Sequence, residues 1–468
     1  MLSLAIRWPG VAMYDSVSQY EQALAGVYGD WHPPIMARGW ALLLRLWPGT
    51  QPFFLLQMLL WWGGLGLLAA ALARTGRGVA AALVLAVGAF PLFLGWATVV
   101  LKDAQMAACL LAATGLVAHW RLACARLPRF VAALVVLLIG YATLVRGNAL
   151  FATVPLTLAL LGWGGMRRWW ARGLLLIGGL LAVLAISPAV NRGLLGAEAN
   201  HNERSLPLYD IAAIGHRAGL AGLPGLSAAE WREAERRGCY TPYFWNPYGE
   251  PAQCDFVGQA LAFGDGRGGH LMRDWLRLVA THPLAYAAHR LAHLNANLRF
   301  LVGPGEPDAM PPIESEPNED GLGAPSGAIA RGLIRLAGLT NATPFGWPAV
   351  WLATALMLLW GSREARGDQI ALGRALALSA AVMSGSFAVA SIASDLRYHL
   401  WSMVAAALAT ILLLDARAVP PRRLRAAVGV VLAVAVAGIA ARLFLAPVYV
   451  PLPAHVPPPP GADRTAAG

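Results

Sequence analysis

Residues 52–73, PFFLLQMLLWWGGLGLLAAALA, hold one polar amide, Gln57, in an otherwise apolar run. A run of about 20 apolar residues is long enough to cross the hydrocarbon core of a bilayer as an α-helix. The chain of 468 residues is 57% hydrophobic and only 13% charged, and its mean hydropathy is +0.55. This composition argues against a soluble globular protein and predicts an all-α polytopic membrane protein.

Comparable apolar runs recur along the chain, and we expect about ten transmembrane helices. They lie near 52–73, 79–100, 104–119, 130–145, 148–163, 173–190, 346–361, 375–392, 398–415 and 426–446. The pattern divides the chain into an outer loop with a juxtamembrane helix (1–51), an N-terminal transmembrane core (52–190), a periplasmic soluble domain (191–345), C-terminal transmembrane helices (346–446) and a Pro-rich tail (447–468).

Arginine residues cluster in every second loop between the apolar runs, and loops rich in Lys and Arg stay on the cytoplasmic side of a membrane. We therefore expect the other loops to face the periplasm of a bacterial cell, with the chain crossing the inner membrane several times. The net charge of +11 then reflects topology and not a nucleic-acid partner. The clusters are Arg74 and Arg77; Arg121, Arg126 and Arg129; Arg167, Arg168 and Arg172; Arg363, Arg366 and Arg374; and Arg417, Arg422, Arg423 and Arg425.

The predicted periplasmic domain contains two cysteines, Cys239 and Cys254. On an oxidising side of the membrane these two thiols are expected to form a disulfide. A metal site is the alternative, but we expect no CxxC or HxxxH spacing to support it. Cys109 lies in an apolar run and Cys124 in a predicted cytoplasmic loop, so both are expected to stay free thiols.

The beginning of the chain does not match this topology. Residues 1–34 should lie in the periplasm, yet no segment before Asp15 is long enough to cross the membrane. Residues 1–12 have a short apolar patch and Arg7, and they fit neither a signal peptide nor a span. We expect that a first helix belongs before Met1 and was lost through a late start codon or a truncation. An in-frame stop codon directly upstream of Met1 would contradict this expectation.

Four groups of polar residues lie at the predicted periplasmic ends of the apolar runs. Charge held close to lipid is costly and usually functional, so we expect the groups to form one site. Taken singly, Lys102 or Arg146 is equally well explained as an interfacial residue. Asp103 has an alternative role as the partner of Lys102. The groups are Asp15 with Asp30 and His32; Lys102 with Asp103; Arg146 with Asn148; and Asp395 with Arg397, Tyr398 and His399.

The chemistry of these residues suits attack on a lipid-borne, phosphate-linked substrate. Cations such as Lys102, Arg146 and Arg397 can hold a phosphate and stabilise its charge as it leaves. A carboxylate such as Asp15 can accept the proton of the attacking hydroxyl. Because phosphate leaves as a stable anion, no second carboxyl group is needed as a general acid, in contrast to glycoside hydrolysis.

The motif Tyr14-Asp15-Ser16, followed by Asp30-Trp31-His32-Pro33-Pro34, resembles the first outer loop of the GT-C superfamily of membrane glycosyltransferases. That superfamily includes protein O-mannosyltransferase-like and aminoarabinose-transferase-like enzymes. The resemblance implies a polyprenyl-phosphate sugar donor, a site on the periplasmic or lumenal face and Asp15 as the catalytic base. It also implies Asp103 as a second acidic position and Arg397-Tyr398 as a late basic motif.

We therefore expect an inverting membrane glycosyltransferase whose acceptor is an envelope glycan, lipid or protein. Undecaprenyl phosphate is the expected carrier in a bacterium. Asp15 and Asp103 are the expected catalytic residues, and no cofactor is expected, because the neighbouring lysine makes a divalent metal between the two carboxylates unnecessary. The expected substrate-binding residues are Asp30, His32, Lys102, Arg146, Asn148, Arg397, Tyr398 and His399.

Two other classes of function stay open. A transporter or flippase for a lipid-linked glycan would need polar side chains along a path through the membrane. The apolar runs contain few such side chains, among them Gln57 and Ser379. A non-catalytic assembly or receptor protein would use the 191–345 domain to bind a partner, and it would tolerate the loss of both Asp15 and Asp103.

Overall fold

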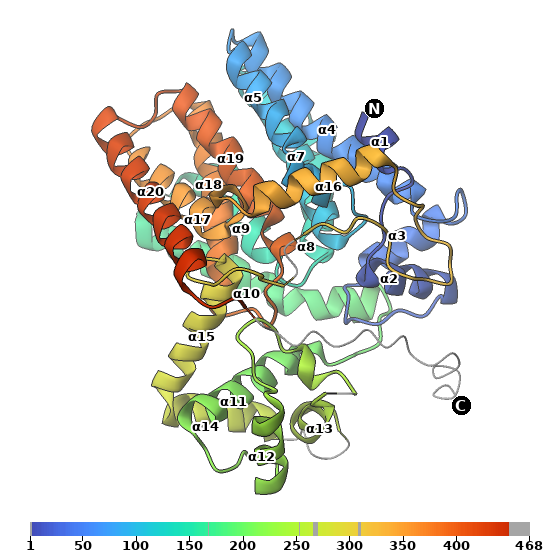
Figure 1. Cartoon of the computed structure of the whole chain (residues 1–468). Helices are drawn as coiled ribbons and strands as arrows, with labels where there is room; N and C mark the ends of the chain where they lie inside the picture. Colours follow the sequence, from blue (N-terminus) through green and yellow to red (C-terminus); the bar gives the residue numbers. More distant parts are fainter. Residues whose placement is uncertain (1, 167, 252, 265–269, 308–309, 449–468) are drawn as a thin grey trace.

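The computed structural model describes residues 2–448 except 167, 252, 265–269 and 308–309 (Figure 1). Within these residues the chain is all-helical, with 20 α-helices and no β-strand, and three isolated bridges pair extended segments. The apolar side chains form one large core from both ends of the chain and a smaller core between residues 208 and 278. From residue 449 onward, the predicted Pro-rich tail lies outside the described residues.

The large core combines an N-terminal and a C-terminal set of helices. The first set is α1 (Leu2–Arg7), α2 (Tyr14–Ala25), α3 (Ile35–Leu43), α4 (Gln51–Arg74), α5 (Gly78–Ala89), α6 (Pro91–Ala97), α7 (Lys102–Arg121), α8 (Arg129–Leu144), α9 (Leu150–Leu160) and α10 (Trp169–Pro188). The second set is α16 (Ala328–Asn341), α17 (Pro348–Gly361), α18 (Asp368–Ser386), α19 (Leu400–Asp415) and α20 (Pro421–Phe444). The two sets interlock because α18 packs against α9 as well as against α19.

The predicted number of ten spans is wrong. Among the described residues, four helices are long and apolar enough to cross a membrane, and a fifth span results if α5 and α6, bent by 57° at their junction, count as one. At 1.5 Å per residue, α8, α9 and α17, with 16, 11 and 14 residues, are shorter than the roughly 30 Å of hydrocarbon. The long apolar helices suit the chain to association with a membrane. The four are Gln51–Arg74, Trp169–Leu194, Leu396–Asp415 and Pro421–Phe444.

Helix α7 is a buried helix at the centre of the large core, and most of its residues are inaccessible. It crosses α4 where Gly64 faces Leu111 and Gly115 faces Gly64. A Cβ atom added to either glycine would overlap the backbone of the other helix. Small residues at such a crossing let two helix backbones approach closely. The alanine- and glycine-rich composition of α7 therefore serves helix packing.

Between α6 and α7 the helix is interrupted at residues 98–101, which leaves main-chain carbonyl groups without helical partners. The amide of Gln57, on α4, donates to the carbonyl oxygens of Ala97 at 2.5 Å and Val99 at 2.9 Å. Gln105 in turn donates to Oε1 of Gln57 at 3.0 Å. Buried main-chain polar groups need such partners. The one polar residue of the 52–73 run thus stabilises the break from which α7 begins.

Gln57→Leu is expected to destabilise the fold by about 1–3 kcal/mol, because it leaves the carbonyl groups of Ala97 and Val99 buried without a donor. Thermal unfolding of the detergent-solubilised protein measures the change. Leu59→Ala is the matched control, since Leu59 lies on the same helix and is 69% exposed. Equal melting temperatures for Gln57→Leu and the wild type would contradict the role of this amide.

The smaller core belongs to the α11–α15 unit (residues 205–298), which projects from one end of the molecule (Figure 1). At its centre Asp210 is fully buried: it forms ion pairs with Arg290 and with His289 at 3.1 Å, and it accepts a hydrogen bond from Trp275 at 2.8 Å. A buried carboxylate needs several partners of this kind. The helices are α11 (Ser205–Ala218), α12 (Ala228–Arg237), α13 (Asp255–Gly258), α14 (Leu271–Thr281) and α15 (Pro283–Leu298).

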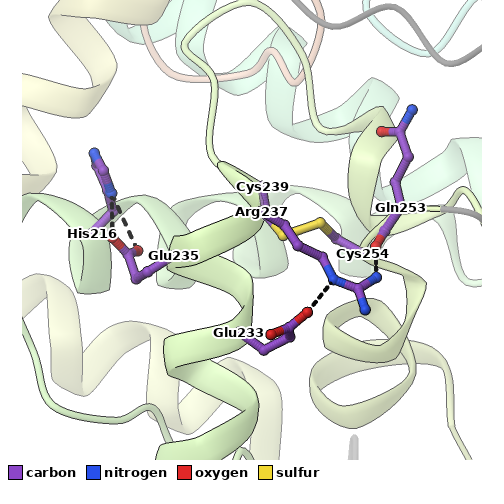
Figure 2. The surroundings of a disulfide bond; sticks show 7 residues. All are labelled: His216, Glu233, Glu235, Arg237, Cys239, Gln253 and Cys254. Atoms are coloured by element: carbon purple, nitrogen blue, oxygen red, sulfur yellow. Dashed lines mark hydrogen bonds and ion pairs between the residues drawn. A yellow bond between two sulfur atoms is a disulfide. The ribbon is translucent and has the colours of Figure 1, made fainter.

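Cys239 and Cys254 form the disulfide expected from the sequence, and Cys109 and Cys124 are free thiols. Figure 2 shows that the bond joins the end of α12 to the start of α13. Beside it, Arg237 donates to Glu233 and to the carbonyl oxygen of Gln253, at 2.6 and 2.7 Å. The disulfide therefore holds together a segment that has little regular structure of its own.

The expectation that no HxxxH spacing supports a metal site is wrong, because the α11–α15 unit contains one. His289 and His293 lie four residues apart on α15, a spacing that can place two imidazoles on one metal ion. Their ring nitrogens instead contact Asp210, Tyr240, the carbonyl oxygen of Pro242 and Asn297. In the described part of the chain, no group of three or more His, Cys, Asp or Glu residues could hold a metal ion.

Cys239→Ser combined with Cys254→Ser is expected to lower the free energy of unfolding of the α11–α15 unit by about 3 kcal/mol, the value for a closed loop of this length. The sequence separation of the two cysteines is 15. Differential scanning fluorimetry with and without reductant measures the loss. Cys124→Ser, which changes an exposed thiol, is the control and should leave unfolding unchanged. If reductant has no effect on the wild type, the disulfide is not stabilising.

Candidate functional site

The candidate site is built where the start of α2 meets the start of α7. Val11 and Val99 form a parallel bridge, in which the amide of Val100 donates to the carbonyl oxygen of Val11 at 2.8 Å. Ser16, on the first turn of α2, donates to the carbonyl oxygen of Val100 at 2.5 Å. This pairing places Asp15, the second residue of α2, beside Lys102, the first residue of α7.

The segment before Asp15 is held on its other side by residues 312–316. Arg7 donates to the carbonyl oxygens of Pro312 and Ile313, both at 2.7 Å. The amide of Ala12 donates to Ser315 Oγ at 2.9 Å, and the amide of Glu316 donates to the carbonyl oxygen of Ala12 at 3.0 Å. Hydrogen bonds therefore fix the chain around Asp15 between residues 99–100 and residues 312–316, two segments that are remote in sequence.

Asp15 is surrounded by positive and imidazole groups. Its Oδ2 lies 3.0 Å from Lys102 Nζ and 3.3 Å from Arg397 Nη2, and its Oδ1 lies 3.8 Å from His32 Nε2. Lys102 also contacts His32 Nδ1 at 2.7 Å. The Asp15 side chain is 14% exposed, so the carboxylate is enclosed but still reachable. We refer to Asp15, His32, Lys102 and Arg397 as the Asp15 cluster.

The protonation states of the Asp15 cluster follow from burial and from the neighbouring charges. Burial opposes ionisation of Asp15, but the charges of Arg397 and Lys102 outweigh it and hold the pKa of Asp15 well below its usual range. Burial lowers the pKa of Lys102 to about 8, although Asp15 opposes this change. Burial, together with the charge of Lys102, lowers the pKa of His32 to about 3. At neutral pH Asp15 is an anion, most Lys102 is a cation, and His32 is neutral and accepts from Lys102.

Asp103 does not pair with the adjacent Lys102, which was one reading of the sequence. It forms a close ion pair with Arg146, and its side chain is only 2% exposed. The guanidinium of Arg146 also donates to Asn148 Oδ1 at 2.6 Å and lies 4.0 Å from the centroid of the Tyr398 ring. Asp103, Asn148 and Tyr398 therefore fix Arg146 in one orientation next to the Asp15 cluster.

Arg397 is held by Asp395 and, through the residues just before Asp395, by the α11–α15 unit. Its Nε lies 2.6 Å from Asp395 Oδ2, and Asp395 Oδ1 accepts from the Arg397 amide at 3.0 Å, so Asp395 is the N-cap of the short helix Leu396–His399. The residues just before Asp395 bond to the unit. The amide of Ser394 donates to the carbonyl oxygen of Tyr243 at 2.8 Å, and Arg290 donates to the carbonyl oxygen of Ser391 at 2.7 Å.

Two predicted site residues lie elsewhere. Asp30 accepts from Arg192 at 2.8 Å and from the Asn200 amide at 2.7 Å, so it joins the α2–α3 loop to the segment before the α11–α15 unit. His399 is fully buried, 3.4 Å from Ser384 Oγ and against the ring of Phe387. Its position supports the start of α19 and does not bring its ring to Asp15.

The residues that sequence reasoning missed are those that orient the site. Ser16 is adjacent to Asp15 and faces the helix break, and Ser315 lies in a Gly- and Pro-rich loop that has no recognisable pattern. Arg192 lies at the end of an apolar run and was not linked to Asp30. The amide of Gln57 was visible as an anomaly in an apolar helix, but its partners are main-chain groups that no side-chain motif identifies.

Comparison of the chain with protein-family models, curated proteins and solved structures finds no match. The chemical capacity of the site therefore has to be argued from its own residues. Three cations, Lys102, Arg146 and Arg397, lie next to a carboxylate that stays ionised at neutral pH. Such an arrangement can bind a phosphate and accept a proton.

Proposed function

We propose that this chain is an inverting membrane glycosyltransferase that moves a sugar from a polyprenyl-phosphate donor to an acceptor hydroxyl or amine. The observation that carries the proposal is Asp15, a reachable carboxylate in contact with Lys102 and Arg397. The resemblance of residues 14–16 and 30–34 to the GT-C superfamily supports it. The reaction would take place on the side from which the α11–α15 unit projects, which we propose is the periplasmic side of a bacterial inner membrane.

The charges of the free site suggest how the donor activates the base. The cations Lys102, Arg146 and Arg397 are matched by the carboxylates of Asp15, Asp103 and Asp395. A donor phosphate would add a negative charge and compete with Asp15 for Lys102 and Arg397. When these cations move to the phosphate, Asp15 loses the charges that depress its pKa. Donor binding would therefore raise the basicity of Asp15 when the acceptor needs a base.

The transfer step then balances without any further reagent. The acceptor oxygen attacks the anomeric carbon and gives its proton to Asp15. The bond between that carbon and the donor phosphate oxygen breaks, and the polyprenyl phosphate leaves with the electron pair. Attack from the side opposite to the leaving group inverts the anomeric configuration. Lys102 and Arg397 stabilise the additional negative charge on the phosphate, a contribution that is greatest in an enclosed site.

The remaining residues would position these groups. Asp103 holds Arg146 and has no direct part in the reaction, since it is enclosed by that ion pair. Asp30 and Trp31 would place the α2–α3 loop at the acceptor side. Trp31 lies 5.5 Å, centroid to centroid, from Trp245 of the α11–α15 unit and is 38% exposed. Aromatic side chains of this kind are suited to contact the apolar face of a sugar.

A transporter of lipid-linked glycans has less support. Such a protein needs polar side chains that line a path. The polar residues within the apolar helices are instead bonded internally: Gln57 to Ala97 and Val99, and Ser379 to the carbonyl oxygen of Ala152 and to Trp401. These bonds close the helix packing, and the charged groups of the Asp15 cluster lie at the starts of helices α2 and α7 and not along an apolar helix.

Asp15→Asn is expected to reduce sugar transfer by at least 100-fold, since a general base contributes about 10²–10⁴ to a rate. The measurement is mass spectrometry of envelope glycolipids and glycoproteins from a deletion strain complemented with each variant. Asp274→Asn, which removes a carboxylate on α14, is the matched control and should restore the wild-type pattern.

The Asp15→Asn result counts only if the variant folds. Folding is checked by membrane abundance and by the melting temperature of the purified variant. Normal transfer by a folded Asp15→Asn variant would refute the assignment of the base. Accumulation of a lipid-linked sugar on the cytoplasmic side in the deletion strain would indicate transport instead of transfer.

The affinity for polyprenyl phosphate is expected to fall as the pH rises through about 8, where Lys102 loses its proton. The affinity decreases with pH because only the protonated lysine attracts the phosphate, and this is the major form below about pH 8. Lys102→Arg should remove the decrease, since an arginine stays charged at every accessible pH. Isothermal titration with undecaprenyl phosphate between pH 6.5 and 9.5, values chosen to bracket the lysine pKa by roughly 1.5 units, measures the effect. The same decrease in Lys102→Arg would assign the titration to another group.

A further inference from the structure

A second charged site lies between the end of α17 and the start of α20, at the end of the molecule opposite to the α11–α15 unit. A cavity of about 520 Å³ is lined there by Trp360, Pro420, Arg422, Arg423 and Ala426. The other end of α20 reaches the α11–α15 unit, since Arg442 donates to the carbonyl oxygen of Arg299 at 2.9 Å. Figure 1 shows the start of α20 at the end of the molecule away from that unit.

The polar groups of the cavity are partly fixed in place. Arg423 donates to Glu364 at 2.5 Å and to the carbonyl oxygen of Gly361 at 3.4 Å, and its guanidinium lies 5.9 Å from the centroid of the Trp360 ring. Arg363 lies 5.5 Å from the same ring. Arg363 and Arg423 share the carboxylate of Glu364, and Arg422 also lines the cavity, so this region has an excess of positive charge.

Arg422 is the cation of the cavity that is open to a ligand. Its side chain is exposed, and within the described part of the chain it has no hydrogen bond or ion pair of its own. Arg423 beside it is already engaged with Glu364. An added anion would therefore meet one uncommitted guanidinium, Arg422, next to a fixed one, Arg423, which lies over the Trp360 ring.

The surroundings of the cavity indicate which kind of anion it would bind. Helix α20 is one of the long apolar helices, and of its residues only Ala427, Gly438 and Ala441 are buried. Its outer surface therefore suits contact with lipid chains, and the cavity lies where a headgroup would be. Tryptophan is favoured at this depth of a membrane. Guanidinium groups form paired hydrogen bonds with phosphate, and basic pockets between helices at the cytoplasmic face hold anionic headgroups.

We propose that the cavity lined by Trp360, Arg422 and Arg423 binds the phosphate of an anionic phospholipid from the leaflet at this end of the molecule. The lipid would strengthen the packing of α20, of whose residues only Ala427, Gly438 and Ala441 are buried, against the end of α17. The site is separate from the Asp15 cluster, and the proposal does not depend on the glycosyltransferase function. Arg422 is the ligand-binding residue, and Arg423 and Trp360 shape the cavity.

The test is native mass spectrometry of the full-length protein released from nanodiscs. The probes are phosphatidylglycerol and cardiolipin, with phosphatidylcholine as the uncharged comparison. The wild type is expected to retain an anionic lipid in preference to phosphatidylcholine. Arg422→Ala should weaken that binding about five-fold, which corresponds to about 1 kcal/mol for one basic residue at a membrane surface. Arg425→Ala is the matched control, since Arg425 is an exposed arginine of the same helix that does not line the cavity.

The outcomes distinguish specific binding in the cavity from nonspecific attraction of anionic lipid to the charged surface. Equal weakening by Arg422→Ala and Arg425→Ala would mean that diffuse surface charge holds the lipid, and would overturn the proposal. Equal retention of phosphatidylcholine and phosphatidylglycerol would also overturn it. Displacement of the lipid by millimolar inorganic phosphate would assign the cavity to a soluble phosphate. Arg422→Lys, which keeps the charge, should recover part of the affinity and shows that the loss in Arg422→Ala is not a folding defect.

Discussion

The hydrogen bonds that close the helix break at residues 98–101 determine where the charged groups of this protein meet. Without a donor such as Gln57, the carbonyl groups of Ala97 and Val99 would be unpaired inside an apolar core. With the break in place, the strand-like residues 99–100 can pair with residue 11. That pairing is what brings the first turn of α2 to the first turn of α7, and with them a carboxylate and an ammonium.

The electrostatics of the Asp15 cluster follow from this placement. The positive end of a helix dipole disfavours a lysine at the first position of α7 and favours a carboxylate on the first turn of α2. The contact at 3.0 Å between Lys102 and Asp15 offsets the unfavourable interaction of Lys102 with the dipole of α7. Burial makes each unpaired charge costly, so the carboxylates and cations of the site occur as matched partners. A site of this kind responds strongly to an added charge, because every group in it is already committed to another.

The sequence predicted the helical class and the disulfide, and less of the arrangement of the helices. An all-helical chain, long apolar helices and the Cys239–Cys254 disulfide follow from composition, periodicity and cysteine placement. The approach of Asp15 to Lys102 and Arg397 was expected because all three were placed on the same side. The topology itself is only partly supported, since four or five candidate spans replace the predicted ten.

The failures have physical causes. The partly buried helix α9 is as apolar as a membrane span, so hydropathy alone cannot distinguish a helix packed in protein from one packed in lipid. The partners of Asp30, Asp103 and His399 depend on contacts remote in sequence, which a single chain without relatives does not reveal. The role expected for Asp103 in the site stays a prediction, and the structure shows that it pairs with Arg146 and not with Lys102.

The distance in sequence between the members of the site also has a consequence for biosynthesis. Ser16 and Val100, whose contact brings Lys102 to Asp15, are 84 residues apart, whereas Met13 and Arg397 are 384 residues apart. At roughly 5–20 residues per second, the ribosome makes Arg397 on the order of 20–80 s after α2. During most of that interval Lys102, which is made earlier, is the available cation for Asp15. The site is complete only after Arg397 has been made.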